Sequence, residues 1–255
     1  MPIFINNQRL ARLAGVDFDS EEIRPGPLVY SRTHTIAPQF GKLQTFPPCI
    51  LITSFSDTHV TPELVEGLPS NVRRWFSNNV SVDHPRVQAV PIGLRTSPEG
   101  EGILRAAIAR GRLPERNLVY MNFWRQFHRR PHPRSGLYET FGGQSWITTE
   151  GGFEHVPMDI FYEQMASHPF IMSPPGAGDD CHRHWESILL GSIPIVLRSP
   201  VTRLLDELPC LQIDDWGEVT EERLSREKDQ LMARFQSPAM ERIWFEYWEA
   251  RIREA

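Results

Sequence analysis

The sequence has few cysteines, and they form no recognisable pattern. Cys49, Cys181 and Cys210 are odd in number and widely spaced, and they include no CxxC pair. This spacing excludes a disulfide framework and gives no sign of a zinc site. We therefore expect reduced thiols, as in a cytosolic protein.

Long apolar segments are also missing. No stretch approaches the ~20 apolar residues that span a bilayer, and the start, MPIFINNQRLARLAG, lacks the apolar core of a signal peptide. We expect no transmembrane segment. The expected location is cytoplasmic, with peripheral binding at the inner face of the membrane left open.

An excess of positive charge and the common metal motifs are absent as well. The formal net charge is -5, which gives no general attraction to nucleic acid, so we expect no nucleic-acid partner. HExxH, paired CxxC and a well-placed DxD do not occur, and we expect neither a metal nor a cofactor. The Walker lysine and the order GxGxxG are also missing.

Short apolar runs alternate with helical patterns along the 255 residues. This alternation is typical of parallel sheets in an α/β fold. We predict strands over 27–31, 49–55, 72–77, 87–92, 117–123, 169–173 and 193–197, and helices over 99–111, 157–167, 180–191, 200–207 and 220–235.

The pattern divides near residues 111–116, where a helix ends and a new strand begins. We predict two Rossmann-like α/β/α domains that face a cleft, an N-terminal domain over 1–112 and a C-terminal domain over 113–255. Within the second, Ser237 and Pro238 are typical of a helix start. We expect a helix over 237–255 that crosses back and packs on the N-terminal half.

Residues 168–196, HPFIMSPPGAGDDCHRHWESILLGSIPIV, indicate a strand, a loop, a helix, a tight turn and a second strand. Gly176 and Gly178 permit positive φ and close approach of a ligand. Asp179 or Asp180 can cap the helix. In such βαβ units ligands bind beyond the carboxyl ends of the strands, and helix N-termini favour phosphate.

Arg183 and Glu186 are three residues apart and share one face of this helix, which we expect to end at Gly191. An arginine near the helix start can bind a diphosphate with paired donors, and a glutamate one turn later can accept hydrogen bonds from ribose hydroxyls. The alternative is an ordinary Arg183–Glu186 ion pair on a solvated face.

The stretch DDCHRHWESILLGSIPIV resembles the donor-site signature of exostosin-like glycosyltransferases, especially their short bacterial relatives. The family pattern D-x-H-R-x-W-E, followed by a short helix and G-x-I-P, falls on Asp180, His182, Arg183, Trp185, Glu186, Gly191, Ile193 and Pro194. LLDELPCLQIDDWGEVTEERL, RRWFSNNVSVDHPRVQAVPIGL and NLVYMNFWRQFHRRPHPR resemble further family segments. The resemblance covers roughly residues 45–230.

The resemblance implies a GT-B fold, with the nucleotide-sugar donor held mainly by the C-terminal domain and no obligatory metal. It implies that Arg183 contacts the donor phosphates and Glu186 the ribose, while His182 faces either the sugar or the base. The other donor-site residues that it implies are Asp180, Gly176, Ala177, Gly178, Asn122 and one of Arg129, Arg130 or Arg134.

Asp57 follows an apolar strand in SFSDTHV and is the candidate general base, since a carboxylate there would face the cleft from the acceptor side. His59 is the alternative base. Asp57 can instead cap a helix that starts near Pro62 or bond to its own turn. The basic loop over 124–134 is either a diphosphate site or a solvated basic face.

The sequence therefore predicts a metal-independent glycosyltransferase. It would move a sugar from a nucleoside diphosphate to the hydroxyl of a glycan, lipid-linked or small-molecule acceptor, in glycan or polysaccharide biosynthesis. The alternative is a nucleotide- or sugar-binding protein that has the same fold but no catalytic activity. A phosphate-handling enzyme of general Rossmann type has no nucleophile or hydride-cofactor fingerprint to support it.

Overall fold

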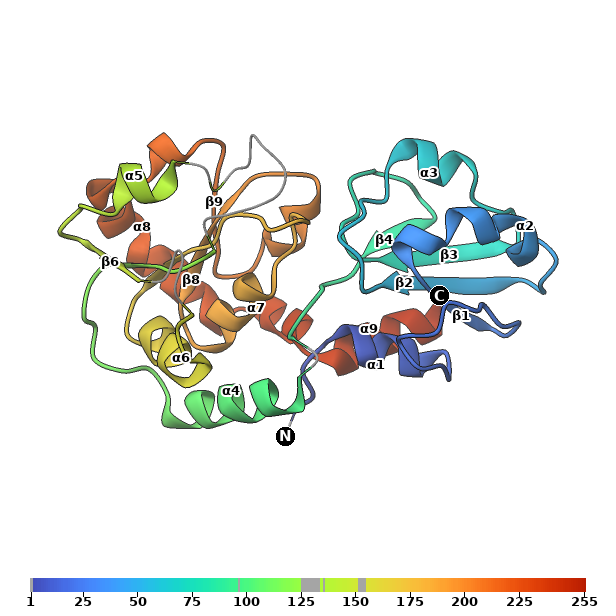
Figure 1. The fold of residues 1–255 in the computed structure, drawn as a ribbon, viewed down its shortest axis with the longest axis horizontal. Coiled ribbons are helices and arrows are strands. Elements are labelled where there is room, and N and C mark those ends of the chain that lie inside the picture. The colour runs from blue at the N-terminus through green and yellow to red at the C-terminus, as the bar shows by residue number, and fades with distance from the viewer. Residues whose placement is uncertain (1, 96, 125–133, 135, 151–154) are drawn as a thin grey trace.

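A computed structural model of the chain describes residues 2–255 apart from 96, 125–133, 135 and 151–154. Two parallel sheets form its two halves (Figure 1). The helices are α1 (Asn7–Leu13), α2 (Phe40–Leu43), α3 (Pro62–Glu66), α4 (Pro98–Arg110), α5 (Leu137–Phe141), α6 (Met158–Ala166), α7 (His182–Leu189), α8 (Glu221–Ala233) and α9 (Phe245–Glu254).

The N-terminal sheet has the order β1-β2-β3-β4, and neighbouring strands are parallel. All four strands were predicted, although the fourth is three residues shorter at its end than expected. β2 is buried at every position, as a central strand covered on both faces must be. The bounds are β1 (Leu28–Arg32), β2 (Cys49–Ser54), β3 (Val72–Ser77) and β4 (Val87–Ala89).

The C-terminal sheet has the order β6-β5-β7-β8-β9, again entirely parallel. The prediction named three of these strands but missed β6 and β9, the three-residue strands at the two edges of the sheet. Edge strands this short leave too few residues for a periodic pattern. The bounds are β5 (Val119–Met121), β6 (Ile147–Thr149), β7 (Phe170–Met172), β8 (Ile193–Leu197) and β9 (Leu211–Ile213).

Helices cover both faces of each sheet, because side chains alternate along a strand and each face must be buried. In the C-terminal half, Tyr120 and Ile171 pack with α4, α6 and α7 on one face, and Val119 and Phe170 pack with α5 and α8 on the other. In the N-terminal half, α2 and α3 cover one face, and α1 and α9 cover the other.

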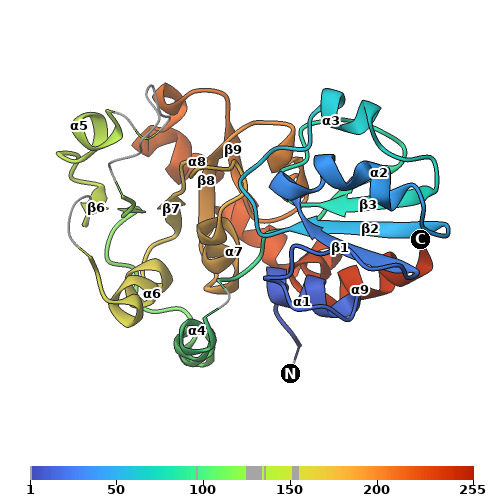
Figure 2. The ribbon, with the colours of Figure 1, turned by 45° about the vertical axis from the view of Figure 1, so that its right-hand side comes forward.

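The chain returns to the N-terminal half at its end, as predicted (Figures 1 and 2). Phe245, Trp248 and Ile252 of α9 pack with Tyr30 and Ile52 of the first sheet. The expected single helix over 237–255 is wrong in one respect. Ser237 and Pro238 do start a helical segment, but it is a 3₁₀ helix (Pro238–Ile243) that ends where Trp244 bridges to Phe4, and α9 starts afterwards.

Residues 90–118 connect the two sheets and include the predicted domain boundary. α4 lies within this connection and packs on α6 of the C-terminal half (Figure 1). Ser97 caps α4 by accepting from Gly100 N, and Gly111 ends it at φ +74°. Within the described residues, none of the helices is both long and apolar enough to cross a membrane.

Candidate functional site

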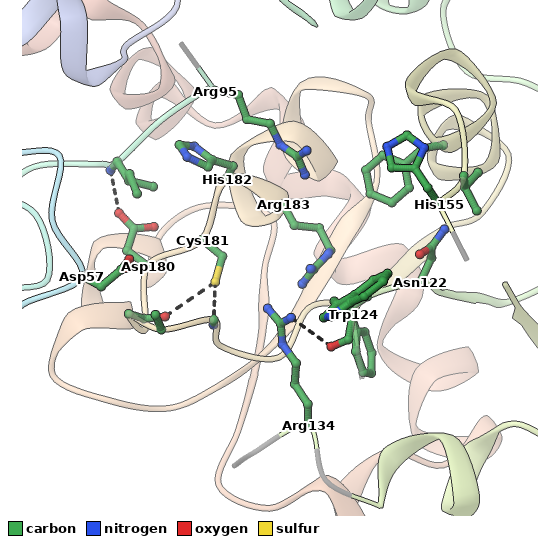
Figure 3. A pocket seen from close by; sticks show the side chains of 17 residues that line it. Asp57, Arg95, Asn122, Trp124, Arg134, His155, Asp180, Cys181, His182 and Arg183 are labelled. Atoms are coloured by element: carbon green, nitrogen blue, oxygen red, sulfur yellow. Dashed lines mark hydrogen bonds between the residues drawn. The ribbon is translucent and has the colours of Figure 1, made fainter. Parts of the chain in front are cut away.

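A cleft of about 530 Å³ lies between the two halves (Figure 3). The segments that follow β5, β6 and β7 line it on the C-terminal side, and the segments that follow β2 and β4 line it on the other side. Its lining contains both aromatic and charged residues: Asp57, Ile92, Arg95, Asn122, Phe123, Trp124, Arg134, His155, Val156, Phe161, Gly176, Ala177, Gly178, Asp180, Cys181, His182 and Arg183.

The topology of the C-terminal sheet explains why the cleft lies there. β5 is followed along the chain by β6 on one side and then by β7 on the other, so the order of the strands reverses between β5 and β7. Ligands of open α/β sheets bind at this reversal, beyond the carboxyl ends of the strands. Asn122 and Trp124 follow β5, and the loop 174–180 follows β7.

In loop 174–180, which we call the donor loop after the ligand expected there, one of the two glycines is needed for close packing. Neither Gly176 nor Gly178 has the positive φ that the sequence allowed. A Cβ on Gly178 would instead lie 2.7 Å from the side-chain nitrogen of Asn79 in the N-terminal half. Gly178 is therefore required for the contact between the halves. The donor loop also lines the cleft, but that a ligand approaches its glycines closely stays a prediction.

The predicted cap of α7 is wrong. Its N-cap residue is Cys181, and neither Asp179 nor Asp180 takes that position. The first turn is held by His184 instead. Its Nε2 donates to the carbonyl of Asp179 (3.0 Å), so its Nδ1 accepts from the Ser173 hydroxyl (2.7 Å). His184 thus joins the two ends of the donor loop, and burial lowers its pKa to about 3.

Cys181 is a neutral thiol in this environment. Burial raises its pKa, and this effect outweighs the nearby charges of Arg183 and Arg134. Its sulfur accepts a hydrogen bond from Gly176 N at 3.1 Å. A thiolate at the helix N-terminus is therefore disfavoured, and the residue packs the donor loop against α7.

Two buried guanidinium groups face the cleft together. Arg183 is 9% exposed and Arg134 is 7% exposed. Burial, and next the charge of Arg183, lower the pKa of Arg134 to about 10, and burial also lowers that of Arg183. Arg183 donates to Pro174 O at 3.3 Å, but its buried Nε has no partner among the described residues.

The alternative of an intrahelical Arg183–Glu186 ion pair is not what the structure shows. Glu186 is 0% exposed, and its Oε1 accepts from the hydroxyl of Tyr162 (3.0 Å) and pairs with Nε of Arg95 (3.3 Å). Its Oε2 is buried without a partner in the described part of the chain. Arg95, which is 47% exposed, thus pairs with the buried Glu186 and also lines the cleft.

Asp180 and His182 connect the donor side of the cleft to the N-terminal half. Asp180 Oδ2 accepts from Ile92 N (2.6 Å), and Oδ1 accepts from Nε1 of Trp185 (2.7 Å). Nδ1 of His182 donates to the carbonyl of Gly93 (2.7 Å), which is an acceptor only. Both residues also line the cleft, so direct contact with a ligand stays a prediction for each.

On the opposite side, Asp57 is exposed and lines the cleft. It is not the cap of the helix near Pro62, because Thr61 is the N-cap of α3 and accepts from Leu64 N. The alternative base, His59, is half-buried and does not line the cleft. Arg129 and Arg130, the other arginines considered for the diphosphate, lie outside the described residues.

Sequence reasoning missed several residues of the cleft. Arg95 follows the run VQAVPIGL, where the sequence pattern predicted only a strand. Three further lining residues, His155, Val156 and Phe161, lie in or just before the predicted helix 157–167, and none of them was predicted to line a site. The one signal in the sequence for Arg95 was a basic residue directly after a predicted strand.

Among the described residues, the cleft included, no group of three or more His, Cys, Asp or Glu side chains is placed to hold a metal ion.

No family model and no curated protein sequence matches the chain. Solved structures do. A UDP-forming α,α-trehalose-phosphate synthase from Burkholderia vietnamiensis is 11% identical with a TM-score of 0.50, covering 98% of this chain and 78% of that one. The corresponding synthase from Burkholderia xenovorans is 10% identical with a TM-score of 0.50, over 91% and 73%. Anabaena Alr3699/HepE in complex with UDP-glucose is 11% identical with a TM-score of 0.49, over 89% and 78%.

These similarities concern the fold. Two parallel sheets with helices on both faces, a cleft between them and a C-terminal helix that returns to the first half make a GT-B fold, as predicted. At 10–11% identity the similarities say nothing of individual residues.

Proposed function

We propose that the cleft binds a nucleoside-diphosphate sugar and that the protein transfers the sugar to an acceptor hydroxyl. The observation that carries this proposal is the pair Arg134 and Arg183. A buried guanidinium beside a second cation is costly unless an anion neutralises it. Among the described carboxylates, none forms an ion pair with Arg183. A diphosphate would supply an anion for Arg183 and can accept paired donors from both guanidinium groups.

The order of side chains along the cleft fits the three parts of such a donor. In the view of Figure 3, Arg134 and Arg183 lie between Asp57 on one side and Trp124, Asn122 and His155 on the other. Trp124 is 50% exposed, and its ring offers a nucleobase a surface for stacking. The sugar would then extend toward Asp57 and the N-terminal half.

Glu186 is the proposed partner of the ribose hydroxyls. It could take that role only after its ion pair with Arg95 opens. Because Arg95 covers the buried carboxylate, Arg95 must move before a ribose can reach it. The unpartnered Oε2 is available as an acceptor once it does. Arg95 would then be free to pair with the diphosphate as a third cation.

In the proposed reaction, the oxygen of the acceptor hydroxyl forms a bond to the anomeric carbon, and the bond from that carbon to the diphosphate oxygen breaks. Asp57 takes the hydroxyl proton as general base and later releases it to water. The nucleoside diphosphate leaves with the electron pair, and Arg134 and Arg183 stabilise its charge without a metal. The acceptor is a glycan, a lipid-linked sugar or a small molecule, as in glycan or polysaccharide biosynthesis, and an exostosin-like relationship belongs to the same proposal.

Calorimetry with UDP, GDP and dTDP tests the donor site. We expect one of them to bind the native protein, and Arg183→Ala to weaken that binding about 10–100-fold, since a hydrogen bond to a charged group contributes about 1.5–3 kcal/mol. The exposed Arg203→Ala is the matched control and should bind as the native protein does. Removal of Arg183 also relieves its repulsion with Arg134, so the variant should keep its unfolding midpoint.

Failure of all three nucleotides to bind, or unchanged affinity in Arg183→Ala, would contradict the proposed donor site. If a nucleotide binds, the corresponding nucleotide sugars are assayed for slow hydrolysis and for transfer to added acceptors. Release of free nucleoside diphosphate supports a transferase. Binding without any turnover would instead support a nucleotide-binding protein with the same fold.

A further inference from the structure

The side-chain amide of Asn79 lies between the donor loop and the loop that carries Asp57. Its Oδ1 accepts from the backbone N–H of Asp180 at 3.0 Å. Its Nδ2 donates to the carbonyl of Ser56, the residue before Asp57, at 3.2 Å. One planar amide therefore bonds to both sides of the cleft, from a position that is 0% exposed.

The backbone of Asn79 is held in the orientation that this double contact needs. Asn79 has φ +48°, a left-handed conformation that asparagine tolerates better than most residues. Its carbonyl accepts from Val60 N at 3.0 Å, which fixes the turn after β3 against the segment leading into α3. Gly178 packs directly on its amide, so a side chain at that position would displace it.

Among the described residues, two other hydrogen bonds between the halves form near this contact, but they do not connect the same two loops. Asp180 accepts from Ile92 N, and His182 bonds to Gly93 O. The first ties the end of the donor loop to the segment after β4, and the second ties the start of α7 to that same segment. Neither of them involves residues 55–59, where Asp57 lies.

We propose that Asn79 is a positioning residue that couples the donor loop to the Asp57 loop, so that the two move as one unit. The inference rests on the proposed function, in which the donor lies on the first loop and the general base on the second. Its consequence is that binding of the nucleotide orders residues 55–59, although they lie in the other half of the molecule. The acceptor side is thereby aligned with the donor before reaction.

The test compares Asn79→Gly with Asn78→Ala. Glycine keeps the left-handed backbone without strain while removing the amide. Asn78 is also an asparagine with 0% exposure, but its Nδ2 donates to Val90 O at 3.0 Å, entirely inside the N-terminal half. Asn79→Asp is the second variant, since it keeps an acceptor for Asp180 N and loses the donor to Ser56 O.

Hydrogen exchange followed by mass spectrometry is measured on the full chain with and without UDP. In Asn79→Gly we expect residues 55–59 and the amide of Asp180 to exchange about 10-fold faster, and UDP to protect 55–59 no longer. In Asn79→Asp only 55–59 should exchange faster. Asn78→Ala should leave the exchange of both segments unchanged. In Asn79→Gly, kcat for turnover of a UDP-sugar should fall about 10–100-fold, while the affinity for UDP stays nearly unchanged.

Unchanged exchange at 55–59 in both Asn79 variants would overturn the inference, as would protection of 55–59 by UDP in Asn79→Gly. Equal effects in Asn78→Ala would reduce Asn79 to an ordinary buried residue and would overturn it too. Hydrogen exchange at residues 55–59 and Asp180 in the ligand-free variants tests the contact whether or not the protein is a glycosyltransferase. If the native protein fails to bind UDP, GDP and dTDP, the proposed function fails while the contact itself is still tested.

Discussion

Asp180 is a carboxyl group buried at the contact between the halves. Burial raises its pKa from the ordinary 3.8 to about 7, even though the N–H groups of Ile92 and Trp185 favour the charged form. The folded protein therefore holds this proton more tightly than the unfolded chain does. The contribution of Asp180 to stability is present below pH 4 and is lost as the pH rises toward 7.

We predict that Asp180→Asn removes this part of the pH dependence. The free energy of unfolding of the native protein, relative to that of the variant, should fall by about 2 kcal/mol between pH 5 and pH 7.5. Urea unfolding at the two pH values measures it. The difference between the proteins is the useful quantity, because buried His184, whose pKa is lowered, gives the opposite slope in both. An equal difference at pH 5 and pH 7.5 would contradict the assignment.

In the donor loop, Gly178 lets the loop of the C-terminal half pack directly on Asn79 of the N-terminal half. We predict that Gly178→Ala destabilises the protein by about 1–3 kcal/mol and weakens nucleotide binding, because the new Cβ would lie 2.7 Å from the Asn79 amide. Gly102→Ala is the control. Gly102 lies in α4 and a Cβ there meets no atom within 4 Å, so alanine should stabilise by about 0.5–1 kcal/mol.

Thermal and urea unfolding of both glycine variants measure these effects. Native-like stability in Gly178→Ala, with nucleotide affinity unchanged, would show that the loop can move away from Asn79 without cost. A loss of stability in Gly102→Ala would show that the comparison does not isolate the contact.

The elements were predictable where the local pattern is strong. β3 and β8 have the predicted bounds. β8 is a short apolar run that follows a glycine turn, and β3 ends directly before two asparagines, which are typical turn residues. The strand at β6 is too short for such a pattern. The Asp179 or Asp180 cap was wrong because Asp180 is used for a long-range bond to Ile92, which no local rule describes.

At the scale of the whole molecule, the two-domain architecture followed from alternation of strands and helices, and the donor segment from its strand–loop–helix context. The contacts that shape the cleft did not. Glu186 pairs with Arg95 rather than with Arg183, and Asn79 reaches across the cleft. Each of these joins residues that are about a hundred positions apart in the chain, a separation at which sequence patterns carry no information on contact.

The carboxyl ends of both sheets face the same cleft, so residues that follow strands in each half meet there (Figure 3). The C-terminal half supplies Arg134 and Arg183, the N-terminal half supplies Asp57, and Arg95 comes from the segment after β4. The 3₁₀ helix and α9 return the chain to the first sheet, which fixes the halves to each other at a second place. The cleft is thus a product of both halves rather than a property of either.

A crystal structure with the nucleoside diphosphate that calorimetry identifies tests the central claim most directly. The account predicts that the diphosphate lies between Arg134 and Arg183, that the base stacks on Trp124, and that Arg95 has left Glu186 to the ribose. A nucleotide bound elsewhere, or one in the cleft with its phosphates away from both arginines, would contradict it.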